Sequence, residues 1–478
     1  MGSRILITFI GTRGDAQPYM VAAQSLQTAG FEVMTAGNED ASSLAESFKV
    51  PFHGTQMSAR EMMTNELLVE AFTEQSISKI VKAQQQIFSE GRRRQELEKW
   101  RQLLRDFRPQ LILCGGVSHF TVPPMAREMS IPVVSFALQR WRPSRFLTPF
   151  GIPKTNLGLL NLACWNLVHF LLLRDAKLRD GPVLEEFFQK PAQEVVMSMH
   201  ELDDLISYKV AYPSIIAESH ALHGDFPPDF NENNIRIGPM IPAASQQLGP
   251  EFGSVGEVGA METFLLKGEA PVYFGYGSMI CKNSKFMTLL SLRALQLTGF
   301  RGIFCAAWSE MSLSLVEGEA DAEELRNFCK DHVLFVKFAP HGALFPRCRV
   351  VVHHGGAGTT NASARSGTPT VVLPLSFDQF DHADMVNRSG IGVGMKVMHS
   401  LTPEEIAQAI CKCTQTEAIR DRAREVSLAM EKENGPADLV QFVKAFMKDF
   451  VENGRHLKMQ ADLRQRRSSW LRWCLPCC

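Results

Sequence analysis

The chain has 478 residues, which is too long for one ordinary hydrophobic core and predicts two or three domains. Its hydrophobic fraction of 45%, charged fraction of 21% and net charge of -1 are those of a globular protein and argue against bulk binding to nucleic acid. The 11 cysteines form no paired CxxC framework with zinc spacing, so free thiols in a reducing compartment are expected.

The start of the chain and one long apolar stretch bear on targeting. The opening MGSRILITFIGTRGD begins a strand at once without a signal-peptide layout, and Leu6 stands where a myristoylation signal requires Ser or Thr. The longest apolar stretch, 157–173, is interrupted by Asn161, Asn166 and His169 and is shorter than the roughly 20 residues that span a bilayer. We therefore expect a cytoplasmic protein in which this stretch forms an apolar helix, either buried or lining an apolar acceptor pocket.

The first half of the chain alternates β-rich runs with helical patterns. Helical periodicity covers 18–30 and the charged stretch 78–107, in which the run Arg92–Arg94 is predicted to be a solvated helix face. Nearly continuous hydrophobic runs, typical of buried parallel strands, lie at 4–11, 31–37, 110–116 and 131–137.

The alternation pauses at 241–260, where Gly, Ser and Pro are typical of a linker, and then restarts. The new strand patterns lie at 271–278, 302–308, 333–340, 349–355, 369–375 and 392–397. Strands that alternate with helices predict parallel sheets. Two such series predict two doubly wound domains that face each other across a cleft, with ligands at the carboxyl ends of the strands.

A glycine-rich turn follows one of these strand patterns, in the stretch VVVHHGGAGTT. A helix is expected to begin near Thr359 or Thr360, so its unpaired N–H groups would form an anion site directly after the strand. Gly355, Gly356 and Gly358 would let a diphosphate approach the backbone, while the threonine hydroxyls add donors. An ordinary strand-to-helix turn is the alternative, but it needs one glycine rather than three.

Other phosphate and metal motifs are excluded at this turn. No Gly-Lys-Ser/Thr follows, as a Walker loop requires, and the G-x-G-x-x-G dinucleotide fingerprint is absent. His353 and His354 are neighbours on a strand and so point to opposite faces, no third ligand is evident, and the chain contains no Asp-x-Asp. The turn therefore predicts a metal-free phosphate site to which a histidine N–H contributes.

Several stretches together resemble one family. YFGYGSM, FAPHGALFP, VVHHGGAGTT and SGTPTVVLPLSFDQ follow one another in the second half, and GTRGDAQPYMVAAQSLQTAGFEV opens the first. In this order they resemble the nucleotide-sugar-dependent glycosyltransferases of the GT-B fold. Within these the chain is most similar to the sterol 3β-glucosyltransferases and the glycopeptide and macrolide glycosyltransferases. The resemblance implies an α/β protein with two Rossmann-like domains.

The resemblance also implies donor-side roles for matching residues. Phe338 stands where the family stacks an aromatic ring on the uracil base, and His341 where the backbone contacts that base. His353 matches the histidine that contacts the diphosphate, and a swap of roles with its neighbour His354 stays open. Plant relatives carry a ribose-binding glutamate after the glycine-rich turn, where this chain has Asn361. The phosphate cradle matches Ser278, Gly356, Gly358, Thr359 and Thr360, and the pair that holds sugar hydroxyls matches Asp378 and Gln379.

On the acceptor side, Asp15 in GTRGDAQP is the candidate catalytic base, because it directly follows the first strand. Aspartate is also a favoured helix N-cap, and the two roles are compatible. An ordinary Asp pKa of about 3.9 makes a weak base, so burial or domain closure would have to raise it. Arg13, with Gly14 beside it, would orient Asp15 or the acceptor, or would be an exposed loop residue.

The organisation expected from these patterns places acceptor and donor in different domains. The expected parts are an acceptor-binding domain at 1–242, a linker at 243–260, a nucleotide-sugar domain at 261–438, a helix at 439–454 that crosses back to the first domain, and a tail at 455–478. The tail has six Lys/Arg and one Asp beside Trp470 and Trp473 and ends in three cysteines, Cys474, Cys477 and Cys478. It is either a peripheral membrane contact with lipidated cysteines or an unmodified, disordered end.

The resemblance implies an inverting, metal-independent transfer of a hexose, glucose being the best guess. The UDP-sugar is a co-substrate, no further cofactor is expected, and the acceptor is a hydroxyl of a hydrophobic molecule such as a sterol or terpenoid. One alternative is a specialised-metabolite enzyme that acts on a phenol, macrolide or glycolipid, since the weakly matched segment 51–207 would decide the acceptor. Another is a non-catalytic protein that binds a lipid or a nucleotide sugar.

Overall fold

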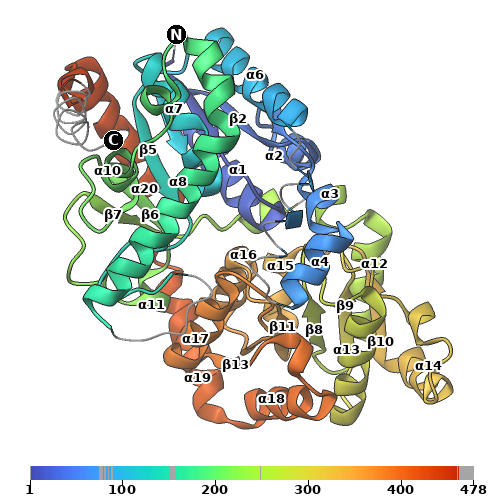
Figure 1. The fold of residues 1–478 in the computed structure, drawn as a ribbon. Coiled ribbons are helices and arrows are strands. Elements are labelled where there is room, and N and C mark those ends of the chain that lie inside the picture. The colour runs from blue at the N-terminus through green and yellow to red at the C-terminus, as the bar shows by residue number, and fades with distance from the viewer. Residues whose placement is uncertain are drawn as a thin grey trace.

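Two parallel β-sheets, one from each half of the chain, form the framework of the molecule (Figure 1). The computed structural model describes residues 2–74, 79, 82–83, 86–87, 90–149, 157–247, 249–459 and 461. The first sheet has the strand order β3-β2-β1-β4-β5-β6-β7, and the second has the order β10-β9-β8-β11-β12-β13. All their pairings are parallel. The prediction of two doubly wound, Rossmann-like domains is confirmed.

The central strands of both sheets are almost wholly apolar, because helices cover both faces. Strands β4 and β11 are buried along their whole length. The first sheet comprises β1 (Arg4–Thr8), β2 (Glu32–Asn38), β3 (Phe52–Gln56), β4 (Leu111–Cys114), β5 (Val133–Ala137), β6 (Ser214–Ala217) and β7 (Asn234–Ile237). The second comprises β8 (Val272–Gly275), β9 (Gly302–Cys305), β10 (Val333–Val336), β11 (Val350–His353), β12 (Thr370–Val372) and β13 (Gly392–Gly394).

Helices alternate with these strands along both halves of the chain. The helices of the first half are α1 (Arg13–Thr28), α2 (Ser42–Phe48), α3 (Ala59–Met63), α4 (Glu66–Thr73), α6 (Glu90–Phe107), α7 (Val122–Glu128), α8 (Leu159–Phe188), α9 (Ala192–Val195), α10 (Met199–Ile206) and α11 (His220–His223). Those of the second half are α12 (Val255–Leu266), α13 (Ser284–Thr298), α14 (Ala322–His332), α15 (His341–Leu344), α16 (Ala357–Arg365), α17 (Gln379–Ser389), α18 (Pro403–Gln415), α19 (Glu417–Met430) and α20 (Gly435–Phe446).

Strands β3, β6 and β7 were not expected from the sequence. β3 and β7 lie at the two edges of the first sheet, and β3, with the sequence FHGTQ, is not a continuous hydrophobic run. β6 is buried but begins with a serine, so its hydrophobic run is confined to 215–217 and does not stand out as a buried strand. The linker expected at 243–260 is also partly helical, since α12 begins at Val255.

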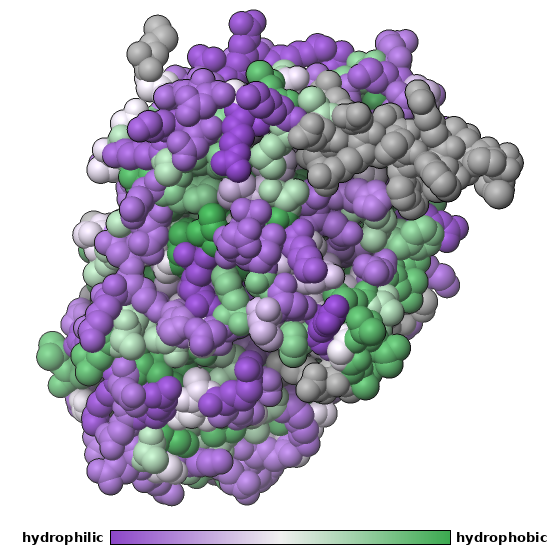
Figure 2. Space-filling view, turned by 90° about the vertical axis from the view of Figure 1, so that its left-hand side faces the viewer, coloured by the Kyte–Doolittle hydropathy of each residue, from purple (hydrophilic) through white to green (hydrophobic). Residues whose placement is uncertain are grey.

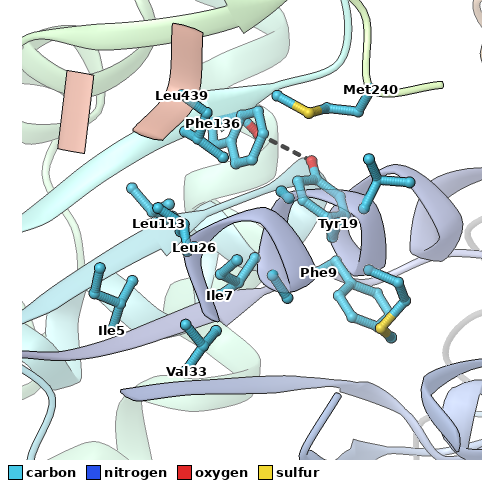
Figure 3. Packing of buried hydrophobic residues seen from close by; sticks show 14 of the residues in the cluster. Ile5, Ile7, Phe9, Tyr19, Leu26, Val33, Leu113, Phe136, Met240 and Leu439 are labelled. Atoms are coloured by element: carbon cyan, nitrogen blue, oxygen red, sulfur yellow. Dashed lines mark hydrogen bonds between the residues drawn. The ribbon is translucent and has the colours of Figure 1, made fainter. Parts of the chain in front are cut away.

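The packing of α1 shows how the first domain is held together (Figure 3). The hydroxyl of Tyr19 on α1 donates a hydrogen bond to the Phe136 carbonyl of β5 at 2.9 Å, and the two rings meet edge to face at 5.2 Å. Leu439 of α20 belongs to the same buried cluster as Ile5 and Ile7 of β1. The last helix therefore returns to the first domain although it follows the second in the chain (Figure 1). It continues as a helical segment at Met447–Glu452, within the range where a crossing helix was expected.

The run Arg92–Arg94 is not a uniformly solvated face, because Arg93 points into the first domain. Its guanidinium donates to both carboxylate oxygens of Asp180 on α8, at 2.7 and 2.8 Å, and to Glu96 at 2.9 Å. Burial alone would raise the pKa of Asp180, but its bonds to Arg93 lower it. The interaction ties α6 to α8, whereas Arg94 on the outer face pairs with the exposed Glu186.

Replacing Asp180 should be strongly destabilising. We expect Asp180→Ala to lower the free energy of unfolding by about 3–5 kcal/mol, since it leaves a buried guanidinium without its main counter-charge. Glu186→Ala removes the exposed pair with Arg94 and should cost less than about 1 kcal/mol. Urea unfolding of the two variants compares them directly, and equal effects would contradict the buried role of Arg93.

Candidate active site

The candidate site lies where the two sheets present their carboxyl ends to each other. The strand order reverses between β1 and β4 in the first sheet and between β8 and β11 in the second, and ligands bind at such switch points. Helix α1 begins after β1 and α16 begins after β11, and the two helix starts meet. The Gly14 carbonyl oxygen lies 3.6 Å from the place that a Cβ on Gly358 would take. Within α1 the Gly14 carbonyl would accept the N–H of the residue one turn further along, but that residue is Pro18, which has no N–H to donate.

The three glycines of the turn after β11 differ in what they permit. A Cβ on Gly355 would lie 2.8 Å from Val372, and its φ of +93° is one that L side chains rarely adopt. A Cβ on Gly356 would lie 2.4 Å from Nε2 of His354. These two glycines are therefore required by protein packing, whereas a Cβ on Gly358 would make only an ordinary contact, 3.6 Å from the Gly14 carbonyl oxygen. Backbone approach by a ligand, expected at all three glycines, stays a prediction.

The two threonines at the start of α16 are used differently. The Thr360 hydroxyl donates to the Gly356 carbonyl at 2.9 Å and is buried, so it serves the turn itself. Thr359 is only half-buried and lies next to Gly358. The next residue, Asn361, donates from its amide nitrogen to the Ala357 carbonyl at 3.0 Å, and its amide oxygen is buried with no hydrogen-bond partner among the described residues.

The adjacent histidines of β11 face different surroundings. His353 is fully buried, its Nδ1 accepts the Gly355 N–H at 3.0 Å, and its Nε2 lies 2.9 Å from the Thr370 hydroxyl. His354 instead lies against Gly356 and the turn at Gly277, and its Nδ1 has no hydrogen-bond partner among the described residues. Both ring nitrogens of His353 are thus engaged by the protein, whereas His354 has a buried nitrogen, Nδ1, that no described residue engages.

The residues expected to bind the sugar lie between β12 and α17. Asp378 directly precedes α17, and the preceding Phe377 has a φ of +53°, a strained conformation for a non-glycine residue. The Gln379 side-chain oxygen accepts the N–H groups of Leu375 and Ser376 at 2.8 and 3.1 Å, which holds this loop in place. Gln379 is buried, and its side-chain oxygen stabilises the loop, whereas the Asp378 side chain stays partly accessible to solvent.

Two residues near Asp378 were missed from the sequence. The side chain of Gln139, which follows β5 in the first domain, lies close enough to Asp378 to lower the pKa of its carboxyl. His382 lies one turn further along α17, with Nδ1 2.6 Å from the Gly355 carbonyl and 3.7 Å from Asp378. Burial raises the pKa of Asp378, while His382 and Gln139 act in the opposite direction. The i, i+4 spacing of Asp378 and His382 was visible in the sequence, but the approach of Gln139 depends on how the domains meet.

Asp15 lies in the first turn of α1 and takes part in its cap. Its Oδ2 accepts the Thr12 N–H at 2.8 Å, but the N-cap residue is Thr12 and not Asp15 as expected, so Asp15 is the acidic partner of a capping box. Asp15 remains reachable by water. Desolvation of the carboxyl by the surrounding protein, and next the negative charge of Asp378, raise the pKa of Asp15 to about 6. The hydrogen bonds from Thr12 act in the opposite direction and lower this pKa. A carboxylate with this pKa accepts a proton more readily than an ordinary aspartate does.

Arg13 points toward the second domain's side of the site. Its guanidinium pairs with Glu251 at 2.9 Å and lies over the rings of Phe252 and Phe338, at 4.9 and 5.3 Å from their centroids. None of these contacts is with Asp15, and a role of Arg13 toward the acceptor stays a prediction. Arg13 instead lies beside Phe338, the residue matched to base stacking.

His341 and Ser278 complete the set predicted from the sequence. Nε2 of His341 lies 3.0 Å from the Tyr273 hydroxyl, and its ring stacks on Phe345 at 4.3 Å. Ser278 is partly buried in the turn after β8, next to Gly277. A Cβ on Gly277 would lie 3.0 Å from Cε1 of the His354 ring. The turn that carries Ser278 and the turn that carries His354 are therefore in contact.

The part of the chain that the structure describes holds no group of three or more His, Cys, Asp or Glu placed to bind a metal ion. Transfer without a metal or a further cofactor stays a prediction.

Models of protein families match both domains. Residues 5–134 match the glycosyltransferase family 28 N-terminal domain, and residues 312–446 match the C-terminal domain of erythromycin biosynthesis protein CIII-like proteins. The solved glycotransferase of kitacinnamycin aligns with 93% of this chain and 98% of its own, with a TM-score of 0.61 at 15% identity. The chain belongs to the glycosyltransferases of the GT-B fold.

Relatives of this GT-B glycosyltransferase include proteins named for sterols. It is 25% identical to "Sterol 3-beta-glucosyltransferase UGT80B1" of Arabidopsis thaliana, over 91% of this chain and 67% of that protein. It is 34% identical to the sterol 3-beta-glucosyltransferase of Saccharomyces cerevisiae, over 35% of this chain and only 13% of that one. The solved glycosyltransferase VinC in complex with dTDP covers 93% of this chain and 98% of its own, with a TM-score of 0.58 at 16% identity.

Proposed function

We propose that this glycosyltransferase transfers a hexose, glucose being the expected sugar, from a UDP-sugar to a hydroxyl of a hydrophobic acceptor such as a sterol or terpenoid. The observation that carries the proposal is the placement of Asp15, with its raised pKa, opposite Asp378 and the start of α16. One domain thus supplies a base and the other supplies an anion site, which are the two groups that glycosyl transfer requires.

The proposed chemistry is a single displacement. The Asp15 carboxylate takes the proton of the acceptor hydroxyl, whose oxygen attacks the anomeric carbon while the bond from that carbon to the diphosphate breaks. Negative charge develops on the leaving UDP, where the N–H groups at the start of α16 and the ring of His354 would stabilise it. Attack opposite the leaving group inverts the anomeric configuration. Asp378 would hold sugar hydroxyls with its carboxylate.

Two groups of relatives favour different acceptors. The sterol glucosyltransferases of plants and fungi support a sterol or terpenoid. The match of the second domain to erythromycin biosynthesis protein CIII-like proteins supports a specialised metabolite such as a macrolide. We give the sterol reading priority because the plant relative aligns with 91% of the chain.

An assay of the purified full chain with UDP-glucose against sterols, triterpenoids, phenols and macrolides tests the proposal. We expect release of UDP together with the mass of a glucoside for the preferred acceptor class. Release of UDP without a glycoside would indicate hydrolysis and a missing acceptor. Saturable UDP binding without turnover on any acceptor, also with UDP-galactose or dTDP-glucose, would favour a non-catalytic binding protein instead.

A further inference from the structure

Helix α8 exposes a long row of apolar side chains to solvent. The apolar stretch 157–173 was expected to be buried or to line a pocket, but much of it lies on the outer face of the first domain. We call the exposed members the α8 stripe; they are Leu157, Leu159, Leu160, Leu167, Phe170, Leu171, Leu172 and Leu178, each between 38% and 71% exposed. Figure 2 shows hydrophobic side chains gathered along the right-hand edge, which is the side nearest the viewer in Figure 1, where α8 lies in front.

An ordinary surface helix buries its apolar face and exposes its polar one, whereas α8 is apolar on both faces, since it also buries Trp165, Leu173 and Ala176. Its buried face carries Asn161, whose amide donates to the Arg145 carbonyl at 2.9 Å, and His169, which lies against the Trp165 ring. Burial lowers the pKa of His169 to about 4, so this ring is neutral at neutral pH. The leucines of the stripe face outward, while inside the domain the Asn161 amide is hydrogen-bonded and Nδ1 of His169 is buried without a hydrogen-bond partner among the described residues. Exposed apolar patches of this kind mark interaction surfaces.

The charges around the α8 stripe are basic. The sequence from Leu157 to Leu173 contains no charged residue. Arg174 and Lys177 follow it and are exposed, and Asp175 is paired with Arg179 at 2.9 Å. Arg145 is exposed near the other end of the stripe, where its carbonyl meets Asn161. An apolar row bordered by exposed basic groups complements an anionic bilayer surface, whose lipid tails accept the leucines and whose head groups attract the cations.

The position of the stripe relates it to the candidate site. Helix α8 begins after the loop that leaves the carboxyl end of β5, and the first residues of this loop include Gln139, which reaches Asp378. The apolar row therefore starts on the side of the first domain that faces the second. None of the described helices combines the length and the apolar character needed to cross a membrane.

We propose that the α8 stripe docks the first domain on the surface of a bilayer that contains anionic phospholipid. The helix would lie in the plane of the membrane, with Leu167, Phe170 and Leu171 among the acyl chains and Arg174 and Lys177 at the head groups. This proposal is independent of the acceptor and of the transfer reaction. It also differs from the tail contact predicted from residues 455–478, whose tryptophans and cysteines lie outside the described residues.

Flotation of the full chain with lipid vesicles tests the docking surface. The first variant is Leu167→Gln/Phe170→Gln/Leu171→Gln, and the matched control is Leu266→Gln/Leu297→Gln/Leu428→Gln, which changes three leucines that are 80%, 57% and 62% exposed elsewhere. With vesicles of phosphatidylcholine and phosphatidylserine, the first variant should need at least about tenfold more lipid for half-binding, and the control less than about twofold more. Arg174→Gln/Lys177→Gln should weaken binding to these vesicles and not to phosphatidylcholine alone.

Thermal unfolding and UDP binding should be unchanged in all three variants, which separates docking from folding and from the donor site. Vesicle binding unchanged in the α8 variant would overturn the proposal. A dimer in sedimentation that the same variant dissociates, with lipid binding intact, would also overturn it and assign the stripe to a second copy of the chain. Equal losses in the α8 and control variants would show a non-specific apolar effect and count against docking through this helix.

Discussion

Asp15→Asn should abolish sugar transfer while leaving the protein as stable as the wild type or more so. As the general base, the carboxylate should account for about 10²–10⁴-fold of kcat, and an amide cannot accept the proton. The amide oxygen can still accept the Thr12 N–H, so the cap of α1 is kept. Loss of activity and retention of the fold are therefore separable in this variant.

The stability of Asp15→Asn follows from the sign of the pKa shift. The folded-state pKa of about 6 exceeds the unfolded value, so the folded chain loses stability as the pH rises through 6 and Asp15 ionises. Asparagine removes that cost. We expect the melting temperature at pH 8 to be unchanged or higher by about 2 °C, and the difference to vanish below pH 4.

The pH profile gives a second test of the same residue. Below its pKa the carboxyl is protonated and cannot act as a base, so kcat/KM should fall on the acid side with an apparent pKa near 6. The charge of Asp378 contributes to raising that pKa, so residual activity of Asp378→Asn should show its acid limb at lower pH. An unshifted limb would show that a different group titrates.

Asp40→Asn is the matched control, since Asp40 caps α3 in the same domain through the Ala59 and Arg60 N–H groups at 3.0 Å. It should transfer sugar like the wild type. Full activity of Asp15→Asn would contradict the assignment of the base. His119, after β4, would be a poor substitute, because the Gly116 carbonyl and the Ser135 hydroxyl engage its two ring nitrogens.

What the sequence could predict here was mainly local. The run of valines, the glycines and the following helical pattern placed the turn after β11, since strand and helix periods and glycine preferences depend on neighbouring residues. The role of each glycine depended on Val372 and the His354 ring, which only the folded structure brings close. The wrong predictions concern residues whose contacts come from distant parts of the sequence. The burial of Arg93 follows from Asp180, 87 residues away, and no pattern around Arg92–Arg94 reveals it.

For helix α8 too, the local sequence predicted the helix but not which of its faces packs against the domain. Its hydrophobicity was evident, but which face turns inward depends on the carbonyls of Arg145 and Leu147, which satisfy Asn161 and Trp165 inside the domain. The alternation of side chains on β11 likewise predicted that the two histidines face opposite ways. The alternation did not show which histidine points into the core of the second domain, because that depends on the contact with Thr370 of the neighbouring strand β12.

The two histidines should therefore respond differently to the same change. His354→Ala should lower kcat about 10²–10³-fold, because in the proposed mechanism it removes an N–H donor to the charge that develops on the leaving diphosphate. Burial lowers the pKa of His354 to about 4, so the ring acts as a neutral donor and its effect should not titrate near pH 6. UDP affinity should fall less than kcat, since the charge is greatest in the transition state. His354→Asn keeps an N–H donor and should recover part of the loss.

His353→Ala should instead lower the free energy of unfolding by about 2–4 kcal/mol, because it opens a cavity in the core and leaves the Gly355 N–H without an acceptor. Thermal unfolding and single-turnover transfer, measured on both alanine variants, separate the two roles. If His353→Ala were folded and stable but inactive, and His354→Ala active, the diphosphate contact would belong to His353, as the family match first implied. The buried bond between Nε2 of His353 and the Thr370 hydroxyl argues for the opposite result, since a ring held at both nitrogens has no donor left for a phosphate.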